Sequence, residues 1–101
     1  MKLQPLPFAE IRAGRKTVEL RLYDEKRRQI AVGDTIVFRC GDASVRTRVR
    51  ALHRFSDFAA LYAAMPIERV GYPARAEDME AYYTKAEQAQ YGVLGIEIEV
   101  V

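Results

Sequence analysis

The chain has little of what builds disulfide-bonded, zinc-binding or membrane proteins. Its 101 residues include one cysteine, Cys40, and one histidine, His53. A single cysteine excludes a disulfide within the chain, and so few cysteine and histidine residues argue against a zinc site of the usual kind. No apolar run approaches the length of a membrane span, and residues 1–7 lack the apolar centre of a signal peptide. We therefore expect a cytoplasmic protein with no metal, no cofactor and no membrane segment.

Internal repeats, linkers and low-complexity segments are also missing. A chain of 101 residues is long enough for one modest hydrophobic core and too short for two, so we expect a single domain over residues 1–101. Half of the residues are hydrophobic and 30% are charged, which is an ordinary composition for a globular domain.

The net charge of +2 conceals a strong asymmetry along the chain. Residues 1–54 contain 13 Lys and Arg against 6 Asp and Glu, whereas residues 55–101 contain 3 against 8. The first half is therefore the half that would attract phosphate groups.

Hydrophobic periodicity and turn residues predict an α+β domain with four strands. We expect strands over residues 17–22, 34–40, 44–55 and 93–101, and helices over residues 7–13, 58–65, 76–83 and 84–91. Gly14 ends the first helix, Ser56 and Asp57 cap the second, and Thr84 with Glu87 forms a capping box. Helices inserted between the third strand and the last suggest a small, closed or nearly closed β-barrel with short helices around it.

The segment from Gly14 to Arg21 brings opposite charges together on a turn and a short strand. Alternation places Thr17, Glu19 and Arg21 on one face of that strand, and Lys16 lies at its start. A converging ammonium, carboxylate and guanidinium could hold a phosphate or a base edge and tune the lysine for proton transfer. The alternative is a half-exposed strand whose charges form ordinary surface pairs.

Other candidates for nucleic-acid contact lie outside this segment. Arg46, Arg48 and Arg50 share one face of the third strand, which is either a solvated sheet surface or a track for phosphates. Tyr23 directly follows the first strand and Tyr72 lies in a loop, and both rings are candidates to stack on a base. His53 is interpreted as a packing residue.

The pattern G-x-K-x-x-E-x-R, formed by Gly14, Lys16, Glu19 and Arg21, resembles the signature of the ASCH (ASC-1 homology) domain family in the PUA-like superfamily. Residues 30–38, with their Gly-Asp turn before a strand, and residues 91–98 are similar to further segments of that family. The resemblance extends along nearly the whole chain. It implies a PUA-like β-barrel in which the signature residues line a cleft between the barrel and the helices.

The resemblance implies RNA binding, and for some members the cleavage of single-stranded RNA without a metal. Lys16 and Arg21 would hold phosphate, and Glu19 would orient or deprotonate a ribose hydroxyl. The residues that would contact the rest of the RNA are Arg15, Tyr23, Arg46, Arg48, Arg50 and Tyr72.

An alternative follows from another branch of the family, which removes the acyl group from N4-acylated cytidine. Lys16 and Thr17 match that branch, but Glu19 stands where the branch carries its functional threonine. The glutamate that would complete this site is left open among Glu68, Glu77 and Glu80. A third interpretation is a domain that binds a modified nucleotide without reacting with it.

Overall fold

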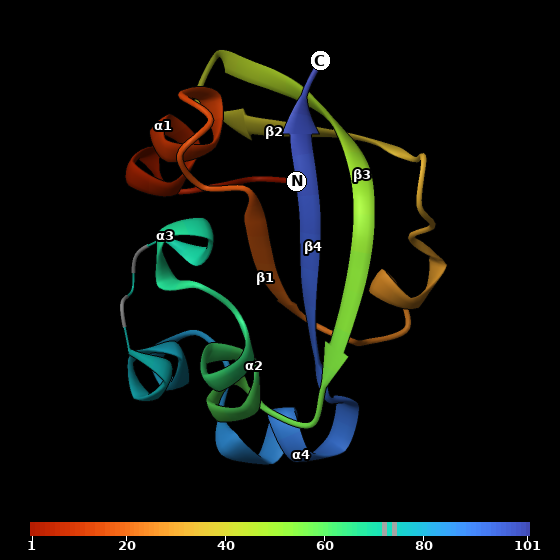
Figure 1. Ribbon diagram of the computed structural model, residues 1–101, viewed down its shortest axis with the longest axis vertical. Coiled ribbons are helices and arrows are strands. Elements are labelled where there is room, and N and C mark those ends of the chain that lie inside the picture. The colour runs from red at the N-terminus through yellow and green to blue at the C-terminus, as the bar shows by residue number, and fades with distance from the viewer. Residues whose placement is uncertain (72, 74) are drawn as a thin grey trace.

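The fold is built on a four-stranded sheet in which the last strand of the chain lies in the middle. The computed structural model describes residues 1–71, 73 and 75–101. The strands are β1 (Val18–Leu22), β2 (Thr35–Cys40), β3 (Ala43–Phe55) and β4 (Val93–Val100), in the order β1-β4-β3-β2 with every neighbour antiparallel. The sheet curls into a half-barrel (Figure 1).

The N-terminal residues extend this half-barrel toward closure. Lys2 forms a parallel bridge with Arg39 of β2, and the terminal ammonium of Met1 donates to the Val37 carbonyl at 2.7 Å. On the other side, Arg21 Nη2 of β1 donates to the Lys2 carbonyl at 3.2 Å. Residues 1–3 therefore join the two edge strands, and the expected α+β, PUA-like fold is confirmed.

Short helices cover both faces of the sheet. Helix α1 (Pro5–Arg12) packs on the concave face through Phe8 and Ile11, and the 3₁₀ helix η1 (Arg27–Gln29) follows β1. The helices α2 (Phe58–Ala64), α3 (Ile67–Val70), η2 (Ala76–Ala81) and α4 (Lys85–Tyr91) gather at one end of the molecule, beside β1 and the adjoining ends of β3 and β4 (Figure 1). In β3 the side chains of Arg46 and Arg48 remain exposed, whereas the alternating Val45, Thr47 and Val49 are buried.

Strand alternation divides the apolar residues into two clusters. Inside the half-barrel, residues of β2, β3 and β4 pack around Phe8, Ile11 and Phe38. On the other face, β1 and the start of β4 pack against Phe58 and Leu61 of α2. In β3 the alternation is interrupted by a bulge at Arg50, because Val49 and Ala51 pair with successive residues of β4.

The predicted elements are largely present, with two differences. The four strands are confirmed, and so are the Asp57 cap, whose side chain accepts from Ala60 N, and the Thr84–Glu87 capping box. Residues 76–81 form a 3₁₀ helix rather than an α-helix over 76–83, and the four-residue helix α3 was not predicted. Among the described residues, no helix is both long and apolar enough to cross a membrane.

Candidate functional site

The side chains of Lys16, just before β1, and of Glu19 and Arg21 within it meet, and we call these residues the charged triad. Gly14, at a φ of +79°, turns the chain out of α1 and into the segment that carries Lys16. Lys16 Nζ lies 3.5 Å from Glu19 Oε1, and Arg21 Nη2 lies 3.0 Å from Glu19 Oε2. Lys16 and Glu19 are only 4% and 5% exposed. The interpretation of this segment as a half-exposed strand with surface ion pairs is therefore wrong.

Every charge of the triad has a partner. Glu19 Oε1 also accepts from the Leu20 amide at 3.0 Å, and Glu19 Oε2 accepts from both Nε and Nη2 of Arg21. Lys16 Nζ donates to the Val70 carbonyl at 2.7 Å. With two cations around one carboxylate, the triad has a formal excess of one positive charge. Such an excess, held away from water, attracts an anion more strongly than a solvated side chain does.

Burial affects the pKa of Lys16. Desolvation lowers the pKa of its ammonium, because the charged form loses its hydration, and the neighbouring Glu19 only partly opposes this shift. A lysine whose pKa is lowered in this way has a larger neutral fraction near neutral pH than a solvated one.

Helix α3 holds Lys16 in place. The Thr17 amide donates to the Arg69 carbonyl at 2.9 Å, next to the bond from Lys16 to Val70. Gly71 then ends the helix at φ +80° and ψ −159°, a conformation that only glycine adopts readily. A Cβ at Gly71 would lie 3.4 Å from Cδ of Lys16. The end of α3 therefore lies beside the lysine side chain, and it is the positive φ that favours glycine at residue 71.

A pocket of about 290 Å³ opens beside the triad. Lys16 and Thr17 line it together with the end of α1 and the end of β4, through Ile11, Gly14, Ile98, Glu99 and Val100. Its size is near the lower end of small-molecule sites, where a single base or sugar phosphate fits. Of the triad, only Lys16 contributes to the wall of this pocket.

The whole chain, residues 1–101, matches the family model described as "ASCH domain". The chain belongs to the ASCH domain family. This family is generally linked to RNA binding.

Two solved structures resemble this ASCH domain closely. The crystal structure of hypothetical protein PH0355 is 35% identical, with a TM-score of 0.90, over 100% of this chain and 96% of that one. The solution NMR structure of protein PF0455 from Pyrococcus furiosus is 33% identical, with a TM-score of 0.79, over 100% of this chain and 94% of that one. No curated protein matches the chain.

A second polar cluster of the ASCH domain lies next to the triad and was not predicted. Arg69 Nε donates to Thr17 Oγ1 at 3.2 Å, and Arg69 Nη2 lies 2.8 Å from Glu97 Oε1. His53 Nε2 lies 3.1 Å from the same oxygen. These contacts with His53 and Arg69 lower the pKa of Glu97. Thr17 thus belongs to this cluster rather than to the face of Glu19, and His53 has a carboxylate partner.

The sequence gives little signal for this cluster, because its members are far apart along the chain. Strand pairing brings them together: β4 lies between β1 and β3, so Glu97 of β4 pairs with Val18 of β1 on one side and Ala51 of β3 on the other. Charged and apolar residues alternate at residues 96–100 of the sequence. Which side chains contact Glu97, however, depends on this strand register and on the position of α3.

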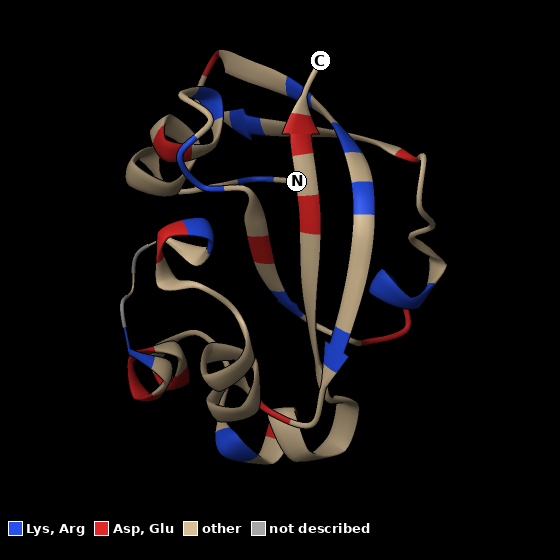
Figure 2. Ribbon diagram, viewed as in Figure 1, with Lys and Arg blue, Asp and Glu red and all other residues tan. Residues whose placement is uncertain are grey.

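The arginines proposed to follow the RNA lie elsewhere on the surface of the ASCH domain. Arg46 and Arg48 are exposed, on the face of the sheet opposite to Glu19. Arg50 occupies the bulge and pairs with Glu99 at 3.1 Å. Figure 2 shows these basic positions of β3 beside acidic positions of β4. Arg15 is exposed and pairs with Glu10 at 2.8 Å.

Tyr23 lies at the end of β1 away from Lys16. It contacts Arg28 and Arg54 there. Tyr72 lies outside the described residues. Over residues 1–71, 73 and 75–101, no three His, Cys, Asp or Glu side chains gather in a way that would hold a metal ion.

Proposed function

We propose that this ASCH domain binds single-stranded RNA and receives one nucleotide at the pocket beside the charged triad. The observation that carries the proposal is the burial of Lys16 and Glu19 next to a pocket that Lys16 lines. Keeping ions from water is costly, and in folded proteins such groups concentrate at functional sites. The family's general link to RNA binding supports the same ligand class.

In this proposal Lys16 supplies the charge that attracts a phosphate or a base oxygen into the pocket. Glu19 and Arg21 position Lys16. Arg21 holds the Glu19 carboxylate, and Glu19 Oε1 in turn lies 3.5 Å from Lys16 Nζ. Arg46 and Arg48 extend the positive electrostatic field over the exposed face of β3 and guide the RNA during encounter.

Binding fits the site better than cleavage does. A general base must have an oxygen free to take the proton of a ribose hydroxyl. Both oxygens of Glu19 already accept hydrogen bonds from the protein, from Leu20 and from Arg21. Glu19 is therefore proposed to orient the lysine rather than to deprotonate RNA.

One observation favours the amidohydrolase alternative, namely the lowered pKa of the buried Lys16 amine. A neutral lysine can act as the nucleophile or base that removes an acyl group from N4-acylated cytidine. In this alternative the Thr17 hydroxyl, which already accepts from Arg69 at 3.2 Å and lines the same pocket as Lys16, would assist it.

The two functions differ in their response to salt. RNA affinity should fall steeply as salt is added, since each neutralised phosphate releases counterions, whereas turnover of an uncharged nucleoside should hardly change. We expect Lys16→Met to weaken binding of a single-stranded 12-nucleotide RNA at least tenfold, and Arg46→Gln with Arg48→Gln to reduce the salt slope. Hydrolysis of N4-acetylcytidine that Lys16→Met abolishes, without RNA binding by the unchanged protein, would establish the alternative instead.

A further inference from the structure

A second cationic site lies at the opposite end of β1 from Lys16. The guanidinium carbon of Arg54 lies 4.1 Å from the centroid of the Tyr23 ring, and that of Arg28 lies 4.8 Å from it. Arg28 Nε also donates to the Tyr23 carbonyl at 3.2 Å. The end of β1 and the η1 helix that follows it thus meet the end of β3, a more distant segment, at one aromatic ring.

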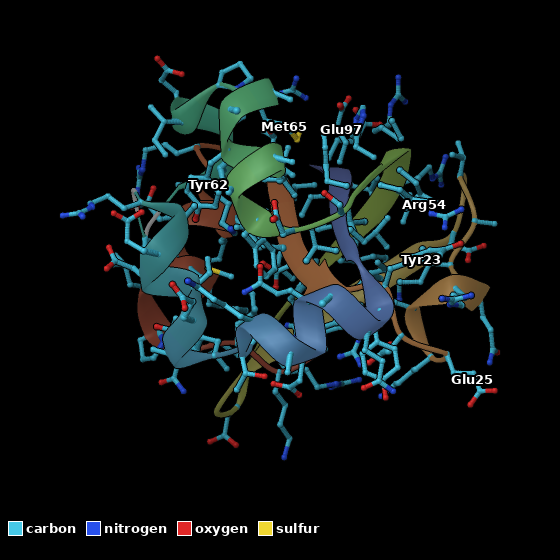
Figure 3. All side chains as sticks on the ribbon, turned by 90° about the horizontal axis from the view of Figure 1, so that it is seen from below. Tyr23, Glu25, Arg54, Tyr62, Met65 and Glu97 are labelled. Carbon is cyan, nitrogen blue, oxygen red and sulfur yellow. The ribbon has the colours of Figure 1, made fainter. Side chains whose placement is uncertain are left out.

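Among the described residues, the two arginines have no acidic partner. Within the part of the chain that the structure describes, no carboxylate lies in salt-bridge distance of Arg28 or Arg54. The nearby Asp24 is engaged with Arg27 at 3.1 Å, and Figure 3 shows Glu25 well apart from Tyr23 and Arg54. The Tyr23 ring therefore holds two positive charges close together without a counter-charge, an arrangement that a bound anion would stabilise.

A pocket of about 400 Å³ adjoins this ring. Arg54 and two partly buried tyrosines, Tyr23 and Tyr91, line it together with Phe55, Ser56, Gly92 and Val93. Aromatic rings and guanidinium planes are the surfaces on which unpaired bases stack, and guanidinium groups bind phosphate through paired hydrogen bonds. A planar aromatic ligand that carries a phosphate fits this combination.

We propose that the Tyr23 pocket, formed by the residues just named with Arg28, is a second nucleotide subsite. Its phosphate lies at Arg28 and Arg54, and its base stacks in the pocket against Tyr91 or the guanidinium plane of Arg54. This inference rests on the proposed function, because the nucleotide belongs to the same single-stranded RNA that enters the pocket beside the triad.

The distance between the two sites sets a minimum length for that RNA. Lys16 and Tyr23 stand at the two ends of the extended segment around β1 (Val18–Leu22), and at about 3.3 Å per residue they are roughly 20 Å apart. One nucleotide cannot reach both sites, whereas a strand of several nucleotides can, as is usual for small single-strand-binding domains.

The test compares Arg54→Gln with a matched control, Arg12→Gln. Both arginines are exposed, and Arg12 also lies over an aromatic ring, at 5.2 Å from the centroid of Phe8. Each variant removes one positive charge, and thermal unfolding checks that both fold. Binding of a mixed-sequence, single-stranded 12-nucleotide RNA is measured by fluorescence anisotropy across a salt series, with Lys16→Met as a third variant.

We expect Arg54→Gln to weaken binding about 5- to 20-fold, in the range found for loss of a stacking and phosphate contact, and to reduce the salt slope by about 1. Arg12→Gln should weaken it less than about twofold, since it changes only the long-range field. Equal effects of Arg54→Gln and Arg12→Gln, with binding still lost in Lys16→Met, would overturn the Tyr23 subsite and leave the proposed function in place. Absence of RNA binding by the unchanged protein would overturn both.

Discussion

Lys16 and Glu19 are the two buried charged residues in the part of the chain that the structure describes. Their burial distinguishes them from the remaining ion pairs, such as Arg50–Glu99, whose side chains are 55% and 51% exposed. A buried pair with one partner removed leaves an uncompensated charge, whereas an exposed pair is replaced by water at little cost.

Glu19→Gln should therefore destabilise the domain by about 3 kcal/mol, because it leaves Lys16 and Arg21 without their carboxylate. The control Glu99→Gln removes only the exposed partner of Arg50 and should cost less than about 0.5 kcal/mol. Denaturant unfolding at neutral pH measures both changes. Similar small losses for the two variants would show that the triad contributes no more than a surface pair.

The lowered pKa of Lys16 predicts how stability depends on pH. Between the folded pKa and the ordinary lysine value of about 10.4, the unfolded chain binds more protons than the folded one, so the free energy of unfolding rises with pH. The unchanged protein should thus gain stability relative to Lys16→Met as the pH rises through this window. Chemical unfolding at a series of alkaline pH values measures the difference, and a constant or falling difference would contradict the shift.

At the scale of elements, α3 is the part of the structure that depends most on its neighbours. A four-residue helix has almost no stability of its own. This one is held through Arg69 and Val70 by Lys16 and Thr17, just before β1, and by Glu97 of β4. The same contacts position the Lys16 ammonium, so loosening α3 should change the site without unfolding the sheet.

Arg69→Gln should increase hydrogen exchange at the Gly71 amide, which donates to the Ile67 carbonyl, while exchange in β3 and β4 stays unchanged. The Arg69 side chain is 39% exposed, so global stability should fall by only about 1 kcal/mol. Arg50→Gln serves as the control, because it removes a similar pair with Glu99 outside α3. Faster hydrogen exchange throughout the sheet in Arg69→Gln would show instead that Arg69 stabilises the whole domain and not α3 alone.

The elements also show how far local sequence signals extend. The alternation in residues 17–22, the Asp57 cap and the Thr84–Glu87 capping box are local, and they predicted β1, α2 and α4. The signature residues likewise indicated that Lys16, Glu19 and Arg21 meet. The bond from Lys16 to Val70, 54 residues away, and the cluster around Glu97 depend on strand order and register, which local periodicity does not contain. The contact of Tyr23 with Arg54 of β3 likewise depends on how the strands are arranged, whereas the sequence shows only that Tyr23 follows the signature strand.

At the scale of the whole molecule, folding places acidic residues of the second half beside basic residues of the first half, which reduces the charge asymmetry between them. Residues 55–101 supply Glu97 and Glu99 on β4, beside the arginines of β3 (Figure 2). The acidic strand thus neutralises part of the basic face, and Arg46 and Arg48 remain exposed without a carboxylate in salt-bridge distance among the described residues.

The exposed arginines of β3 should therefore affect RNA affinity mainly at low salt. Arg46→Gln combined with Arg48→Gln should lower RNA affinity severalfold at low salt and much less at high salt, because these groups act mainly through the long-range field. Filter binding or anisotropy at two salt concentrations measures this. An effect of the same size at both concentrations would instead indicate direct base or ribose contacts on β3.

The central claim is that the pocket beside Lys16, Glu19 and Arg21 receives a nucleotide. Its most direct test is an NMR titration of the ¹⁵N-labelled domain with a single-stranded 12-nucleotide RNA. The account predicts that the largest, saturable shifts of amide signals fall at residues 14–21, 69–71 and 98–100. Saturable binding that leaves the Lys16 and Thr17 signals unchanged would contradict it.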